Sequence, residues 1–167
     1  MYITMKPQFI DCPEKTVVGL GSPFISILSP DRNNAVVIPR LWSAYLPRKQ
    51  EIAHRLSSTD LGICTRLPDE SKRTHPEEFF YLAGAEVTRL DSVPEGMILL
   101  KVPAGRYAVF THKGQLDALE HTMRYIYREW LPSSGCKARP APDIETYDHR
   151  FNPYSDKSEM GIWVAIM

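Results

Sequence analysis

The spacing of apolar and polar positions along the chain predicts a definite order of strands and helices. An extended stretch interrupted by Pro13 is followed by apolar residues at helical spacing, from Leu41 to Leu46. Pro47 is expected to end or kink that helix. The elements predicted for the first half are an extended segment at 8–21, a helix from about residue 34, a short helical piece at 48–56, and strands at 61–67 and 77–90.

The second half repeats this order. An extended stretch broken by Pro103 precedes a helix with an apolar stripe from Leu116 to Trp130, and "LPSSG" ends that helix. The elements predicted here are an extended segment at 97–114, a helix at 116–130, and strands at 141–151 and 160–167. Two strand-helix-strand-strand units, at about 7–90 and 97–167, predict an α+β fold in which pseudo-repeats share a mostly antiparallel sheet with helices on one face.

Length and composition favour a single domain covering 1–167. A chain of 167 residues with 43% hydrophobic and 24% charged residues is typical of one globular domain. The formal net charge is +0, which argues against direct nucleic-acid or membrane-surface binding. The predicted first strand begins near residue 7, so we do not expect a DNA-binding domain in front of it.

The remaining sequence signals indicate a cytoplasmic protein without a cofactor. No apolar run is long enough to span a bilayer, and the N-terminus lacks the apolar core of a signal peptide. The three cysteines are scattered, which suits reduced thiols. Phosphate-loop, dinucleotide-binding, zinc-ligand and serine-nucleophile motifs do not occur, so metal, nucleotide and serine-hydrolase functions are not expected.

The segment "APDIETYDHRF" places a carboxylate in the middle of a predicted strand. Its period of two puts Glu145 on the same face as Asp143, Tyr147 and His149. Burial without a cation would raise the proton affinity of Glu145. The alternative is a solvated glutamate at a sheet edge, paired with an arginine such as Arg139 or Arg150.

Aromatic side chains form a second set of candidates. An aromatic stripe is often simply core, but a buried tyrosine hydroxyl needs a hydrogen-bond partner. Rings around one central carboxylate are suited to a lipophilic cation, because they add cation–π attraction and apolar area to the counter-charge. The aromatic residues predicted to converge are Trp42, Tyr45, Phe79, Phe80, Tyr81, Tyr107, Phe110, Tyr147 and Trp163.

Two basic residues precede the second helix. His112 and Lys113 in "VFTHKG" could hold an anion or supply a general base. The alternative is that both are solvated loop residues.

The second half resembles the GyrI-like, or AraC-type, effector-binding domain family. The resemblance is carried by "PAGRYAVFTHKG", "IYREWLPSSG", "PDIETYDHRF" and "SEMGIWVAI", and it extends to "PRLWSAY" and "YLAGAEV" in the first half. It implies a ligand cavity between the two halves that binds hydrophobic, often cationic, compounds in multidrug-responsive regulation. Glu145 matches the acidic pocket residue of the family and Tyr147 matches the following tyrosine. Leu82 stands where family members often have an aspartate.

The resemblance also implies the walls of that cavity and leaves several roles open. The implied aromatic wall comprises Trp42, Tyr81, Tyr107 and Trp163, and Phe110 and Tyr45 are further ligand-binding candidates. Binding would serve sensing or sequestration. The alternatives are a hydrolase of strained genotoxic electrophiles with Glu145 as general base, or a gyrase-inhibitor-like interaction module. A homodimer or a regulatory protein partner stays open, and no catalytic residue, metal or cofactor is assigned.

Overall fold

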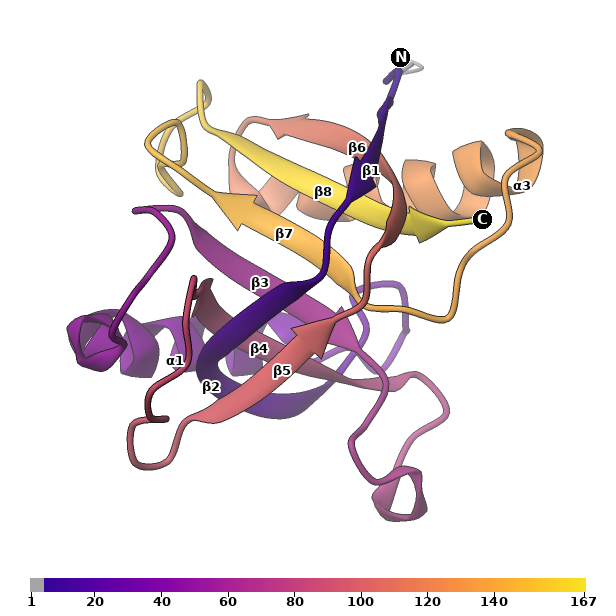
Figure 1. Cartoon of the computed structure of the whole chain (residues 1–167). Coiled ribbons are helices and arrows are strands. Elements are labelled where there is room, and N and C mark those ends of the chain that lie inside the picture. The colour runs from indigo at the N-terminus through magenta and orange to yellow at the C-terminus, as the bar shows by residue number, and fades with distance from the viewer. Residues whose placement is uncertain (1–4) are drawn as a thin grey trace.

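The computed structural model describes residues 5–167. Within this range the chain forms an eight-stranded antiparallel sheet in the order β1-β6-β8-β7-β3-β4-β2-β5 (Figure 1). The α+β class and the antiparallel sheet predicted from the sequence are confirmed. The strands are β1 (Gln8–Cys12), β2 (Lys15–Ile25), β3 (Asp60–Thr65), β4 (Glu78–Glu86), β5 (Ile98–Val102), β6 (Gly105–Lys113), β7 (Asp143–Tyr147) and β8 (Glu159–Ile166).

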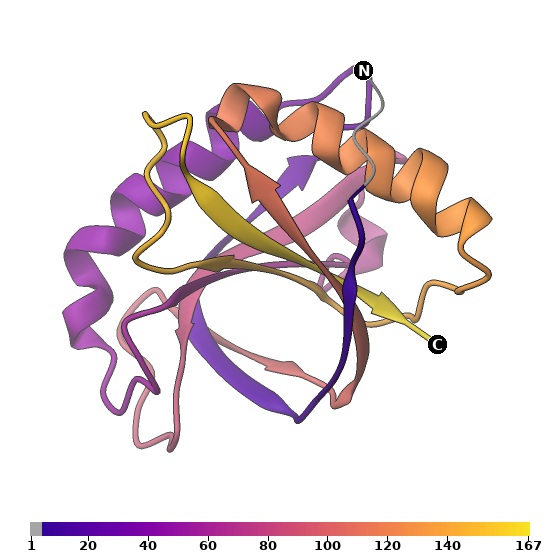
Figure 2. The same ribbon diagram turned by 90° about the horizontal axis from the view of Figure 1, so that it is seen from above.

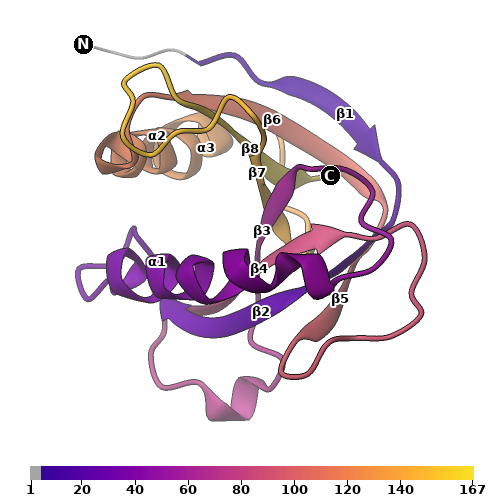
Figure 3. The ribbon, with the colours of Figure 1, turned by 90° about the vertical axis from the view of Figure 1, so that its left-hand side faces the viewer.

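Two helical regions lie on the same side of the sheet (Figure 3). The first is α1 (Asn34–Tyr45), which continues into the 3-10 turn η1 (Leu46–Glu51). The second is one continuous helical region built from η3 (Leu116–Ala118), α2 (Leu119–Arg124), the π-helical turn η4 (Tyr125–Trp130) and α3 (Leu131–Ser133). A short 3-10 turn, η2 (Glu70–Lys72), lies in the β3–β4 connection. No helix in the described part of the chain is long and apolar enough to cross a membrane.

The helical piece predicted at 48–56 is shorter than expected. The 3-10 turn ends at Glu51, and His54 adopts a positive φ of 60°. The left-handed region is incompatible with a continuing right-handed helix. Arg55 then forms an isolated antiparallel bridge with Val87.

The two prolines that interrupt the extended segments lie where the sheet closes on itself. Cys12 pairs with Gly105, and Lys15 pairs with Val102 three residues further along each strand. Because the register is unchanged across this step, β1 with β2 and β5 with β6 form one ladder of two long strands, each broken near a proline. This ladder joins the two ends of the strand order, and the sheet curls into a ring (Figure 2).

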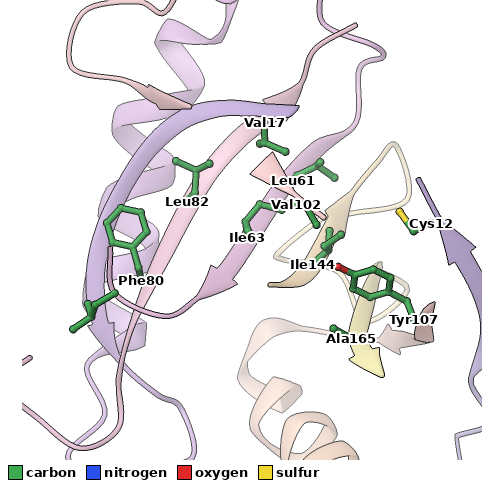
Figure 4. Packing of buried hydrophobic residues seen from close by; sticks show 11 residues of the cluster. Cys12, Val17, Leu61, Ile63, Phe80, Leu82, Val102, Tyr107, Ile144 and Ala165 are labelled. Carbon is green, nitrogen blue, oxygen red and sulfur yellow. The ribbon is translucent and has the colours of Figure 1, made fainter. Parts of the chain in front are cut away.

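The ring encloses one hydrophobic core and the helices cover two more. The inner cluster contains Ile63, Leu82, Tyr107 and Ile144 (Figure 4). The second cluster lies under α1, and the third lies between β6, β8 and the second helical region. Side chains on alternate positions of a strand therefore enter different cores, so the parity of each residue decides what surrounds it.

Candidate functional site

A cavity of about 220 Å³ lies on the helix-covered side of the sheet. Both halves of the chain contribute to its wall: Ile38 of α1 and Phe79 of β4 come from the first half, and Met123 of α2 and Ile162 of β8 come from the second. The wall is mainly apolar. A cavity between the halves was expected from the family resemblance, and the structure has one at this position.

Glu145 lines this cavity from β7. It pairs with Gly62 at the middle of the β3–β7 ladder, and β7 lies in the interior of the strand order. Its Oε2 accepts hydrogen bonds from the hydroxyls of Tyr81 (2.7 Å) and Tyr147 (2.6 Å). Glu145 is therefore a half-buried, central residue of the sheet, unlike the solvated edge residue that was the alternative.

The arginines considered as partners for Glu145 are engaged elsewhere. Arg150 bonds to Asp148 and Glu159 on the surface, and the guanidinium of Arg139 lies 5.2 Å from the centroid of the Tyr107 ring. Within residues 5–167, Glu145 forms no ion pair. Burial raises the pKa of its carboxyl above the ordinary value, and the hydrogen bonds from Tyr147 and Tyr81 act in the opposite direction.

Gly62 leaves the space in which this hydrogen-bond group forms. A Cβ at position 62 would overlap the hydroxyl of Tyr81 and would lie 2.8 Å from Oε2 of Glu145. The missing side chain opposite Glu145 therefore allows Tyr81 to reach across from β4. Sequence reasoning missed Gly62, because a glycine inside a strand does not reveal what approaches it.

A second carboxylate, Asp143, shares the cavity wall with Glu145. Its Oδ2 accepts a 2.6 Å hydrogen bond from the hydroxyl of Tyr127, and its Oδ1 accepts a 2.8 Å bond from the backbone N–H of Ala165. Burial raises the pKa of Asp143 to about 6, against the opposing effects of those two hydrogen bonds and of the charge on Arg139. The period of two in the strand pattern put Asp143 on the face of Glu145, but Asp143 was not among the predicted site residues.

Trp42, Tyr81 and Tyr147 converge around Glu145. The Trp42 Nε1 donates to the Tyr81 hydroxyl at 3.2 Å, and its ring packs against Tyr147 with centroids 4.9 Å apart. Tyr45 stands behind this group: its ring meets Trp42 edge-on at 5.5 Å, and its hydroxyl donates to Asp60. Of these four predicted residues, Tyr81 lines the cavity, and the other three support it from α1 and β7.

Tyr107 and Trp163 lie on the opposite face of the sheet. Trp163 pairs with Ile144, the neighbour of Glu145, so its side chain points away from the cavity. Tyr107 belongs to the core inside the ring (Figure 4). Its hydroxyl donates to the carbonyl of Pro142 at 2.9 Å. These two rings pack on each other, with centroids 6.0 Å apart, and they do not join the group at Glu145.

Phe110 and His112 face the helices but are covered by them. Phe110 is buried against Trp130, with ring centroids 4.9 Å apart. His112 is 2% exposed, and its ring nitrogens lie 2.8 Å from the Thr122 hydroxyl and 3.1 Å from the Gln115 carbonyl oxygen. The alternative that His112 is a solvated loop residue is wrong, because β6 extends through it and its ring contacts Thr122 of α2. Lys113 is exposed and lies 3.5 Å from Glu159.

The chain matches the family model described as the GyrI-like small molecule binding domain over residues 5–167. It belongs to the GyrI-like family. The resemblance found in the sequence motifs is thereby confirmed, and small-molecule binding is the property that the family description gives. Among curated relatives, the transcriptional regulator BrlR of Pseudomonas aeruginosa is 37% identical over 164 residues, which are 97% of this chain and 56% of BrlR.

Other GyrI-like relatives match in part or in fold. The probable transcriptional regulator YgiV of Escherichia coli K12 is 39% identical over 80 residues, or 47% of this chain and 50% of YgiV. The chain thus spans about half the length of the curated relatives it matches. Among solved structures, SAV2435 bound to tetraphenylphosphonium gives a TM-score of 0.70 at 17% identity, covering 98% of this chain and 94% of that one. The EcmrR C-terminal domain gives 0.69 at 13% identity, covering 99% of each chain.

Proposed function

We propose that this GyrI-like domain binds lipophilic organic cations in its cavity, with Glu145 as the principal counter-charge. The observation that carries this proposal is a carboxylate on the wall of an apolar cavity, held by two phenol hydroxyls and without a cationic partner among residues 5–167. Such a carboxylate is costly to ionise on its own. A bound cation supplies the missing charge.

The surroundings of Glu145 support an apolar ligand over a small inorganic ion. Phe24, Phe79 and Ile38 offer ring faces and aliphatic surface on the cavity wall. Cation–π attraction and apolar burial then add to the charge interaction. A cavity that recognises shape and charge with few directed hydrogen bonds predicts affinity on the order of micromolar.

Three relatives support the proposal, one through its ligand and two through their names. SAV2435 shares the fold and carries tetraphenylphosphonium, which is a lipophilic cation. BrlR and YgiV are named as transcriptional regulators. We therefore propose that binding in this domain serves sensing or sequestration of such compounds, with Glu145, Tyr147, Tyr81 and Trp42 forming the ligand-binding group.

The decisive experiment compares two ligands of the same shape and opposite charge. Tetraphenylphosphonium and tetraphenylborate are titrated into the wild type and the Glu145→Gln variant, following tryptophan fluorescence. The phosphonium should bind the wild type and the borate should not, and the variant should lose about tenfold in phosphonium affinity, which corresponds to one favourable charge interaction. Glu129→Gln, which neutralises an exposed glutamate of η4, is the matched control and should leave the affinity unchanged.

Equal binding of the two ligands would mean that apolar area alone drives association. Retention of full phosphonium affinity by Glu145→Gln would remove Glu145 from the proposal. Either result contradicts the function proposed here.

A further inference from the structure

The cavity contains two carboxylates where one would suffice for a singly charged guest. Asp143 and Glu145 are two residues apart on β7, and their register partners, Cys64 and Gly62, lie on β3. Side chains at this spacing point to the same face of a strand and are separated by about 7 Å along it. The two negative centres therefore stand side by side on one wall of the cavity.

Each carboxylate has its own tyrosine partners. Tyr81 and Tyr147 bond to Glu145, and both of their hydrogen bonds fall on Oε2, so Oε1 accepts none from residues 5–167. Tyr127, which comes from the other side of the cavity, bonds to Asp143. Within the described chain neither carboxylate forms an ion pair, and the positive charge that influences Asp143 is that of Arg139.

A third acceptor on the cavity wall is independent of the acidic pair. Asn34, the first residue of α1, lines the cavity, and its Oδ1 is buried without a hydrogen-bond partner among the described residues. A buried amide oxygen without a donor is rare in folded proteins, because it loses its bonds to water and gains none in return. Asn34 and Oε1 of Glu145 are thus acceptors to which a ligand can donate.

We propose that the cavity selects organic dications that carry N–H donors at both ends of an aromatic spacer, with one cationic centre at Glu145 and the other at Asp143. This inference rests on the proposed function, since it specifies the ligand class of the same cavity. A singly charged guest at Glu145 leaves Asp143 as a half-buried charge that forms no ion pair within residues 5–167. A second cationic centre removes that cost and supplies the donors that the free acceptors lack.

A ligand series built on one ring isolates the second charge. 1,4-Bis(aminomethyl)benzene is a dication at pH 7.5, 4-methylbenzylamine is the matching monocation, and 4-methylbenzyl alcohol is the matching neutral compound. Calorimetric titration of the wild type should give about tenfold tighter binding of the dication than of the monocation. In Asp143→Asn the preference should fall to about one, while the monocation still binds more tightly than the alcohol.

Two controls separate charge at this site from general effects. Asp148→Asn neutralises a carboxylate that pairs with Arg150 outside the cavity, and it should retain the dication preference. The 1,2-isomer of the diamine, measured on the wild type, has the same charge with its centres close together, and it should bind about as weakly as the monocation. The measurement with the 1,2-isomer uses only the wild type, so it tests the distance between the two cationic centres even if Asp143→Asn fails to fold.

The outcomes distinguish the two proposals. If the dication binds no more tightly than the monocation, if its 1,2-isomer binds equally well, or if the preference survives in Asp143→Asn, the dication inference is overturned and cation binding at Glu145 stands. If the alcohol binds as tightly as the monocation, cation recognition itself fails, and the dication inference fails with it.

Discussion

Glu145 is held between two opposing influences. Burial favours its protonated form, whereas the hydroxyls of Tyr81 and Tyr147 favour the carboxylate by donating to it. Both donors contact the same oxygen atom, so the second oxygen remains available to a guest. The two tyrosine hydroxyls thus favour ionisation of the half-buried carboxyl group. Only one of its two oxygens accepts hydrogen bonds from the described residues.

Asp143 should make the protein less stable as the pH rises from about 4 to 6. Its pKa is raised to about 6 in the folded protein, above the ordinary value of 3.8, so the native state binds more protons than the unfolded state across this window. The contribution of the protonated carboxyl to stability is fully present below the pKa of the unfolded state. It is lost as the pH rises through the pKa of the folded state. Because the carboxylate is partly accessible, we expect an effect of roughly 1–3 kcal/mol.

Chemical unfolding at several pH values measures this effect. Asp143→Asn should gain stability relative to the wild type as the pH rises from 4 to 7. The side chains that influence this carboxyl are Tyr127, Arg139 and Glu145, and Cys64 is its register partner on β3. Burial also raises the pKa of Glu145. Asp148→Asn is the control of opposite sign, since Arg150 lowers the pKa of Asp148 and the variant should be less stable at neutral pH. If the difference in unfolding free energy between Asp143→Asn and the wild type does not change with pH, the raised pKa of Asp143 is refuted.

At the residue scale, the sequence indicated which side chains carry the chemistry but not on which face of the sheet each one lies. The mid-strand carboxylate and the tyrosine two positions later indicated Glu145 and Tyr147 as neighbours, and they are. Tyr107 and Trp163 were grouped with them, although the register of β6, β8 and β7 puts both on the other face. Register depends on pairing between distant strands, which local periodicity does not specify.

Among the elements, the β3–β7 pair forms the floor of the site. Gly62 should be intolerant of a side chain, although its φ is not positive and a strand accepts alanine. In Gly62→Ala the new methyl group would overlap the Tyr81 hydroxyl and approach Glu145. We expect a loss of about 1–3 kcal/mol in the free energy of unfolding, which is typical of overpacking, together with weaker phosphonium binding.

A double-mutant cycle tests whether the Tyr81 hydroxyl causes that loss. In a Tyr81→Phe background the nearest overlapping atom is absent, so Gly62→Ala should cost less there than in the wild type. Unfolding free energies of the four proteins give the coupling. If the losses in unfolding free energy from Gly62→Ala and Tyr81→Phe simply add, overlap with the Tyr81 hydroxyl is not the reason that Gly62 is required.

The elements themselves were predicted well where periodicity extends over many residues. The apolar stripe from Leu116 to Trp130 indicated a single helix, and the chain is helical throughout that range. The π-helical turn η4 inside it could not be foreseen, because the stripe has the same residues in either geometry. This turn carries Tyr127, which reaches Asp143, and π-helical turns are frequent at functional sites.

On the scale of the whole molecule, the two halves depend on each other. The first half provides β1, which pairs with β6 of the second half, and the second half provides β5, which pairs with β2 of the first. The β3–β7 pair joins them a second time, and the cavity has walls from both. The repeated element order in the sequence indicated two units. It did not indicate that β1 and β5 each pair with the other half, because pairing between distant strands has no signature in the local sequence around Pro13.

A chain divided between Ser92 and Val93 should therefore fold only when its two parts meet. This position lies in an exposed loop outside every strand, so the cut removes no ladder hydrogen bond. Residues 1–92 alone would expose the β2 and β3 pairing edges, and 93–167 alone would expose those of β6 and β7. Circular dichroism should show each fragment largely unfolded, whereas co-expressed fragments should purify together and bind tetraphenylphosphonium. If one fragment folds alone with a cooperative thermal transition, the exchanged strands are dispensable for its folding. The two halves would then be independent folding units, and pairing between them would not be required for the cavity to form.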